Sequence, residues 1–160
     1  MTIAKETKRL NVYALCQCGI FIALATILSF LPVYEMPMGG SVTLASMLPI
    51  LLIGVKFGYK WGLGASTVYM SIQLLQALIK GNVFVYCVGA WSVIVCLLFD
   101  YVVPFMILGL SAFAKPKDNE KLNIVKVCVT FGVLIFARFI CHFITGIVIW
   151  ATLVLDYSHP

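Results

Sequence analysis

Apolar runs long enough to cross a bilayer fill most of this chain, and only short polar segments separate them. Hydrophobic residues make up 62% of its 160 residues and charged residues 11%, whereas soluble domains are about half apolar and about a quarter charged. Because a membrane-spanning helix needs about 20 mostly apolar residues, we predict an all-α, multi-pass membrane helical bundle. The length leaves no room for a separate soluble domain, so residues 1–160 are expected to form one membrane domain.

Five spans are predicted, and the charge of the loops between them alternates. Basic residues cluster before the first span, between the second and third, and between the fourth and fifth. Short loops rich in Lys and Arg stay on the cytoplasmic side, so we predict a cell-membrane protein with a cytoplasmic N-terminus. The net charge of +5 follows from these loops and does not indicate nucleic-acid binding. The spans are expected at residues 10–31, 44–55 (short, and tilted or broken at Pro49), 61–79, from about 91 to the polar loop at 114–121, and 124–155.

Three ionisable side chains, Asp100, Arg138 and His142, lie inside the predicted spans. A charge at the centre of a bilayer costs about 2.5–3.5 kcal/mol unless it faces a partner, water or a ligand, which indicates a polar pocket. Counted along each helix from the nearest basic loop, Asp100 and His142 lie about 22 Å and about 24 Å from the cytoplasmic side. The two residues are therefore predicted to share one height in the outer half of the membrane, under the external segments 33–42 and 81–90.

The fifth span carries a polar face. Arg138, His142, Gly146 and Trp150 recur at intervals of four residues, which places them on one side of a helix. This face offers two possible cations, a gap and an indole, and it predicts a ligand-binding surface. An ordinary buried polar pair with a Trp at the membrane interface is the alternative interpretation.

Asp100 is followed directly by Tyr101, so the fourth span supplies an acceptor beside an aromatic ring. The carboxylate could form a structural bridge to Arg138, or it could hold a cationic or donor-rich ligand against which Tyr101 stacks. Pro104 lies one turn later and leaves a backbone carbonyl without its helical partner.

A polar stripe runs along the third span at steps of three and four residues. It should face the bundle interior, since polar groups that face lipid are costly. Hydrogen bonding between helices and contact with a ligand, in which Gln73 would take part, are both compatible with it. Its members are Ser66, Tyr69, Gln73, Gln76 and Lys80.

The first span contains pairs of small residues four positions apart, among them Gly19 and Ala23. Small residues let helices approach closely in lipid. The pattern predicts either packing within the bundle or a docking face for a separate membrane partner. The other pairs are Ala14 with Cys18 and Ala25 with Ser29.

Several motifs that would indicate chemistry are missing from the sequence. It has no GxxxxGK[ST] phosphate loop, so the chain is not expected to hydrolyse ATP itself. HExxH, GxSxG and CxxC motifs are missing too, and the six cysteines are expected to be small buried hydrophobic residues. We therefore predict neither an enzyme, nor a bound cofactor, nor a metal site.

Three stretches resemble the thiamine-specific substrate-binding subunit (S component) of energy-coupling factor transporters. The first is ALATILSFLPVYEMPMGGSVTLASMLPILLIGVKFGYKWGL at residues 23–63, the second FDYVVPF at 99–105, and the third FARFICHFITGIVIW at 136–150. Within them, the pattern MP-x-GGS-x-TLASMLP and the Trp eight residues after the His of His-Phe-Ile-x-Gly are specific. The resemblance covers most of the chain.

The resemblance implies a six-helix bundle that binds its vitamin near the outer face. Asp100 takes the place of the family's acidic residue, which would grip the aminopyrimidine, and Tyr101 follows it as in the family. His142 and Trp150 match residues of the pocket, and Arg138 falls at a basic position one turn before His142.

The resemblance also implies partners. Thiamine would be the ligand, and a transmembrane coupling subunit with two ATP-binding subunits would supply the energy, docking through Gly19 and Ala23. Tyr34, or Met36, would replace an aromatic residue of the first outer loop. The family's sixth helix is expected to be missing, because the sequence ends at Pro160. An S component for another vitamin or precursor, and a membrane scaffold without a ligand, are the alternative functions.

Overall fold

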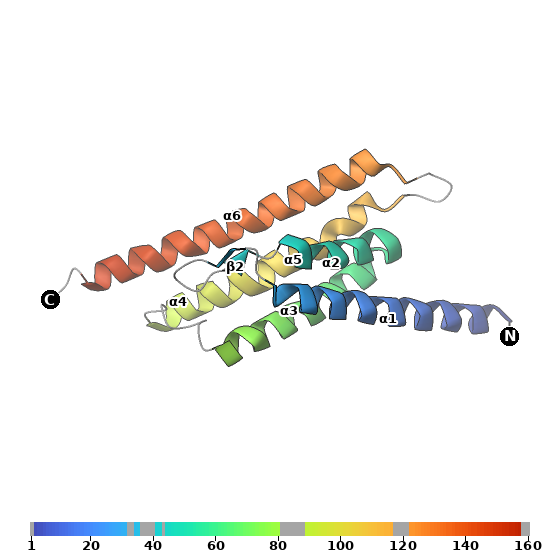
Figure 1. The fold of residues 1–160 in the computed structure, drawn as a ribbon, viewed down its shortest axis with the longest axis horizontal. Coiled ribbons are helices and arrows are strands. Elements are labelled where there is room, and N and C mark those ends of the chain that lie inside the picture. Colours follow the sequence, from blue (N-terminus) through green and yellow to red (C-terminus); the bar gives the residue numbers. More distant parts are fainter. Residues whose placement is uncertain are drawn as a thin grey trace.

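Helices build this protein, whose computed structural model describes residues 2–31, 34–35, 41–42, 44–80, 89–116 and 122–157, with side chains within 12–31, 46–79, 90–116 and 122–148. Figure 1 shows an elongated bundle with the two ends of the chain at opposite ends of the long axis. The long helices are α1 (Thr2–Ser29), α2 (Leu44–Phe57), α3 (Tyr59–Lys80) and α6 (Ile124–Tyr157). Between α3 and α6, four segments follow one another directly: α4 (Gly89–Cys96), the π-helical segment η1 (Leu97–Val102), α5 (Val103–Gly109) and the 3-10 segment η2 (Leu110–Ala114).

Four helical stretches of the described chain are long and apolar enough to cross a membrane, which makes the protein a multi-pass membrane protein. The predicted helical bundle is confirmed, as is a fourth span that begins near residue 91. The second of the five predicted spans is not among these four stretches, because α2 has only 14 residues. The four stretches are Val12–Ser29, Tyr59–Ile79, Ala90–Ala114 and Ile124–Val148.

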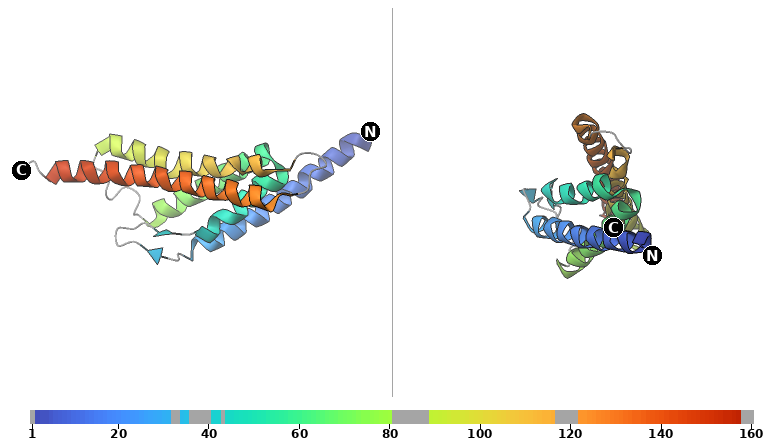
Figure 2. Two further views of the ribbon diagram at one scale, coloured as in Figure 1. Left: turned by 90° about the horizontal axis from the view of Figure 1, so that it is seen from above. Right: turned by 90° about the vertical axis from the view of Figure 1, so that its right-hand side faces the viewer.

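The helices run alternately in the two directions of the long axis, so the α2–α3 turn, the end of η2 and the start of α6 lie at the same end as the start of α1 (Figures 1 and 2). The predicted cytoplasmic charges lie in or next to these segments in the sequence. At the opposite end, β1 (Tyr34–Glu35) and β2 (Ser41–Val42) pair antiparallel, with Tyr34 opposite Val42. This small hairpin is an addition to the all-α prediction. Residues 81–88 of the other predicted external segment lie outside the described chain.

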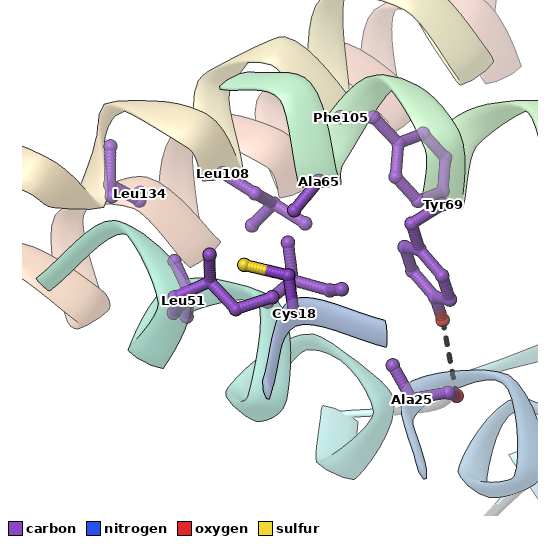
Figure 3. Close-up of a cluster of buried hydrophobic side chains, with 10 residues drawn as sticks. Cys18, Ala25, Leu51, Ala65, Tyr69, Phe105, Leu108 and Leu134 are labelled. Atoms are coloured by element: carbon purple, nitrogen blue, oxygen red, sulfur yellow. Dashed lines mark hydrogen bonds between the residues drawn. The ribbon is translucent and has the colours of Figure 1, made fainter. Parts of the chain in front are cut away.

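The short helix α2 lies at the centre of the packing. Ile50, Leu51 and Ile53 have no exposed surface, and they belong to one cluster with Leu108 of α5 and residues of α1, α3 and α6 (Figure 3). Of the two outcomes expected for this span, tilted or broken at Pro49, the break is wrong, because α2 continues through Pro49 from Leu44 to Phe57. The proline lies early in the helix and removes one backbone donor without ending it.

Three glycines bring α2, α3 and α5 into close contact. A Cβ on Gly62 would lie 2.9 Å from the carbonyl oxygen of Gly109 and 3.0 Å from Cα of Gly54. Small residues permit such an approach between membrane helices. The α2–α3 turn adds Gly58 at a φ of +92°, in the left-handed region where glycine meets no steric penalty. These glycines fix the spacing of the helices that carry the site.

Candidate functional site

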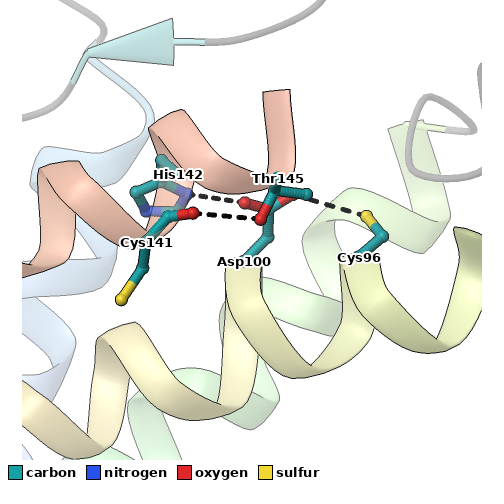
Figure 4. A network of polar contacts seen from close by, with 5 residues as sticks. All are labelled: Cys96, Asp100, Cys141, His142 and Thr145. Carbon is teal, nitrogen blue, oxygen red and sulfur yellow. Dashed lines mark hydrogen bonds and ion pairs between the residues drawn. The ribbon is translucent and has the colours of Figure 1, made fainter. Parts of the chain in front are cut away.

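Asp100 and His142 meet across the interface between η1 and α6. Asp100 Oδ1 lies 2.8 Å from His142 Nδ1, and Figure 4 shows the two side chains pointing toward each other. The prediction that they share one height is confirmed by this contact. Their side chains remain 21% and 38% exposed, respectively. The pair is therefore held between helices and still partly exposed.

The second oxygen of Asp100 has a partner on its own helix. Cys96 Sγ donates to Asp100 Oδ2 at 3.4 Å, and Cys96 is only 4% exposed (Figure 4). An ionised carboxylate can accept about four hydrogen bonds, so both oxygens keep capacity for a ligand. Sequence reasoning assigned this cysteine to the hydrophobic interior only; its spacing of four residues from Asp100 was the signal that would have identified it.

Asp100 and Tyr101 lie in a π-helical segment instead of an α-helix. The N–H of Val103 donates to the carbonyl of Leu98, five residues earlier. Such wider turns are rare and occur frequently at functional sites. Pro104 is the second residue of α5, two positions after the segment, and it cannot donate the α-helical hydrogen bond to the carbonyl of Asp100. The sequence predicted a disturbance at Pro104 but not the π-helical turn that carries the acid.

Arg138 does not form the structural bridge to Asp100 that was one interpretation of the sequence. In the described part of the chain, Asp100 Oδ1 contacts Nδ1 of His142 instead. The guanidinium of Arg138 instead lies over the ring of Phe105, with Cζ 4.2 Å from the ring centre. Its Nε and Nη1 atoms are buried and find no hydrogen-bond partner among the described residues. The bridge fails because Asp100 meets the residue one turn farther along α6.

The polar stripe of α3 faces the interior, as predicted. Ser29 Oγ of α1 donates to Gln76 Oε1 at 3.2 Å, and the buried hydroxyl of Tyr69 donates to the carbonyl of Ala25 at 3.5 Å (Figure 3). Gln73 Nε2 donates to Tyr69 Oη at 2.6 Å. The stripe thus joins α3 to α1. Contact between Gln73 and a ligand remains a prediction.

The remaining candidates around the pair are placed in part. Tyr101 is half-buried and packs against the core cluster. A Cβ on Gly146 would meet no atom of the described residues within 4 Å, so these residues leave space beside His142. Trp150 lies in the same continuous helix α6, and Tyr34 lies in β1. Their side chains, like that of Lys80, are outside the described side chains.

The structure separates the small-residue pairs of α1 into two groups. Gly19 and Ala23 are exposed, and a Cβ on Gly19 would have no neighbour within 4 Å in the described chain. The other two pairs are buried and pack inside the bundle. They are Ala14 with Cys18 and Ala25 with Ser29.

The arrangement is suited to holding a small polar ligand. It offers a partly exposed carboxylate, an imidazole and, at Gly146, a position with no described neighbour, all within an apolar bundle. Among the described residues, no group of three or more His, Cys, Asp or Glu side chains is placed to hold a metal ion. A ligand with a positive charge or several donors would complement the acid.

Comparison with known proteins identifies a family. The family model described as thiamine transporter protein matches residues 15–156, a range that includes η1 and the polar face of α6. Comparison with curated proteins and with solved structures gave no match. Because the family model extends over nearly the whole bundle, this multi-pass membrane protein belongs to the thiamine transporter protein family.

Proposed function

We propose that this protein is the thiamine-binding membrane subunit of an energy-coupling factor vitamin transporter, and that it captures thiamine on the external side. The observation that carries the proposal is the partly exposed Asp100–His142 pair inside an apolar bundle. Thiamine is flat and cationic and carries an amino group on its pyrimidine. A partly buried carboxylate supplies both the counter-charge and the acceptor for such a ligand. Membership of the thiamine transporter protein family supports this choice of ligand.

Six of the candidate residues have a role in this proposal. Asp100 accepts hydrogen bonds from the aminopyrimidine, while His142 holds the carboxylate in place through its Nδ1 contact. Tyr101 and Trp150 supply aromatic faces for the flat cation. Gly146 leaves room one turn beyond His142. From the external side, Tyr34 closes the pocket.

Energy must come from other subunits, because the sequence has no phosphate loop. We propose a transmembrane coupling subunit and two ATP-binding subunits as partners. The exposed pair Gly19 and Ala23 on α1 is the docking face for the coupling subunit, since small residues allow a second helix to approach closely. In this arrangement the N-terminus is cytoplasmic.

Tryptophan fluorescence tests the ligand directly. The chain has three tryptophans, and thiamine should quench the emission because Trp150 contacts it. A Trp150→Phe variant should lose most of the quenching. A Trp91→Phe variant is the matched control, because Trp91 is 71% exposed on α4 and should not contact the ligand. Unquenched emission in the unsubstituted protein would contradict the proposal.

A thermal-shift panel separates thiamine from other vitamins or precursors. A ligand that binds only the folded state raises its stability in proportion to the logarithm of concentration over Kd. Thiamine should raise the unfolding midpoint more than riboflavin, biotin or hydroxymethylpyrimidine at equal concentration. A larger shift with one of the other three compounds would assign the site to that compound.

A further inference from the structure

Phe105 lies between two residues of the polar interior. One face of its ring carries the guanidinium of Arg138, with Cζ 4.2 Å from the ring centre. Tyr69 meets the same ring edge-on, at 5.5 Å between centres and 70° between planes. Phe105 itself is 4% exposed. The ring therefore forms a buried platform for a charged side chain.

The ring of Phe105 contacts the Arg138 guanidinium, where a carboxylate would be the usual partner. A buried guanidinium normally pairs with an acid, and its planar fork fits a carboxylate with two parallel hydrogen bonds. In the described structure, however, Asp100 Oδ1 contacts Nδ1 of His142 instead of Arg138. Nε and Nη1 of Arg138 find no acceptor among the described residues. The attraction of a cation to an aromatic face takes the place of the missing ion pair.

Tyr69 fixes the platform. Its hydroxyl donates to the carbonyl of Ala25 and accepts from Gln73 Nε2, so its ring is held against α1 and along α3. Because Tyr69 is 1% exposed, neither it nor the Phe105 ring packed on it has free space to move into. Arg138 is thus held by successive contacts: Ala25 of α1 binds Tyr69, Tyr69 packs on Phe105, and Phe105 packs on the guanidinium.

We propose that Phe105 is a positioning residue that holds Arg138 away from Asp100 and so keeps the charge of the carboxylate for a cationic ligand. The inference rests on the proposed function, since it names the residue that keeps that binding site available. A bridge between Arg138 and Asp100 would neutralise the acid and occupy acceptor positions that the ligand needs. Without the Phe105 ring, the guanidinium of Arg138 loses its present contact and is free to pair with Asp100.

A double-mutant cycle on ligand affinity tests the proposal. Phe105→Leu keeps an apolar side chain without a π face, and it should weaken thiamine binding about tenfold. In an Arg138→Gln background, the same change should alter Kd by less than about twofold, because no guanidinium is left to compete. Phe131→Leu is the matched control, because Phe131 also packs against the core cluster, and it should bind normally. Equal losses in both backgrounds, or no loss in either, would overturn the proposal.

A second measurement needs no ligand and covers the case in which the unsubstituted protein fails to bind thiamine. Thermal unfolding of Asp100→Asn, Arg138→Gln and the double variant gives the coupling between the two side chains. The coupling should be close to zero with Phe105 present and clearly favourable in the Phe105→Leu protein, where the bridge can form. Equal coupling in the two backgrounds would overturn the role of Phe105. Absence of thiamine binding would overturn the proposed function alone.

Discussion

Asp100 and His142 are 42 residues apart in the sequence, and their side chains meet at 2.8 Å. The contact joins the π-helical segment η1 to α6, the helix with the smallest buried share of the candidate spans, 11%. A peripheral helix held partly by a polar contact is suited to respond to a ligand that uses the same acid. The first prediction follows from this acid.

Replacing Asp100 by Asn should remove most thiamine binding and leave the protein folded. Asn has the same size and keeps an acceptor for His142, but it lacks the negative charge. A hydrogen bond to a charged group contributes about 1.5–3 kcal/mol, so Kd should rise by about 10- to 150-fold. Isothermal titration calorimetry measures the affinity, and a thermal melt checks the fold. Unchanged affinity would exclude Asp100 from the site, whereas an unfolded variant would favour the scaffold function.

Gly54→Ala should destabilise the protein, because the new Cβ would overlap Ser111 Oγ and lie 3.0 Å from the backbone nitrogen of Ala112. The backbone cannot yield without separating α2 from η2. Overpacking of this kind costs about 1–3 kcal/mol, which thermal unfolding in detergent should detect as a lower midpoint.

Gly64→Ala is the matched control for that variant. Gly64 also lies in a helix, but a Cβ there would meet no described atom within 4 Å. Since alanine favours a helix over glycine by about 0.5–1 kcal/mol, this variant should be at least as stable as the unsubstituted protein. Equal destabilisation by both changes would argue against the close contact at Gly54.

Gly58→Ala should weaken the turn between α2 and α3. The φ of +92° at Gly58 places an L-residue in a conformation that costs about 1–2 kcal/mol. Asn tolerates this region better than Ala, so the unfolding midpoints should fall in the order Gly58, Gly58→Asn, Gly58→Ala. An alanine variant as stable as the glycine protein would show that the turn does not require the left-handed conformation.

The height of the site could be predicted from sequence because it depends on one constant. The rise of about 1.5 Å per helical residue, counted from basic loops, placed Asp100 level with His142. The polar stripe of α3 was predictable for a similar reason, because steps of three and four residues place its polar side chains on one face of a helix. That face points away from lipid, where polar groups are costly. Both predictions use spacing along single helices.

The partner of Asp100 depended on geometry that spacing does not contain. Arg138 and His142 lie on one face of α6 and differ by one turn, so a π-helical turn around Asp100 is enough to change which of them it meets. The central position of α2 in the bundle could not be predicted from the sequence either. Lipid is as apolar as a protein core, so the buried Ile50 and the exposed Ile147 belong to equally hydrophobic runs.

The docking face gives the last prediction. Gly19→Leu and Ala23→Leu place bulky side chains on the exposed side of α1, where a Cβ on Gly19 has no neighbour within 4 Å in the described chain. The changes should leave folding and thiamine affinity unchanged, since they face away from the core and from Asp100. They should reduce co-purification with the coupling subunit by about tenfold, because a helix contact that needs small residues is blocked. Gly132→Leu on α6 is the control, since Gly132 is exposed and equally free of described neighbours. Unchanged assembly with both α1 variants, or equal loss with Gly132→Leu, would assign the docking face to another part of the bundle.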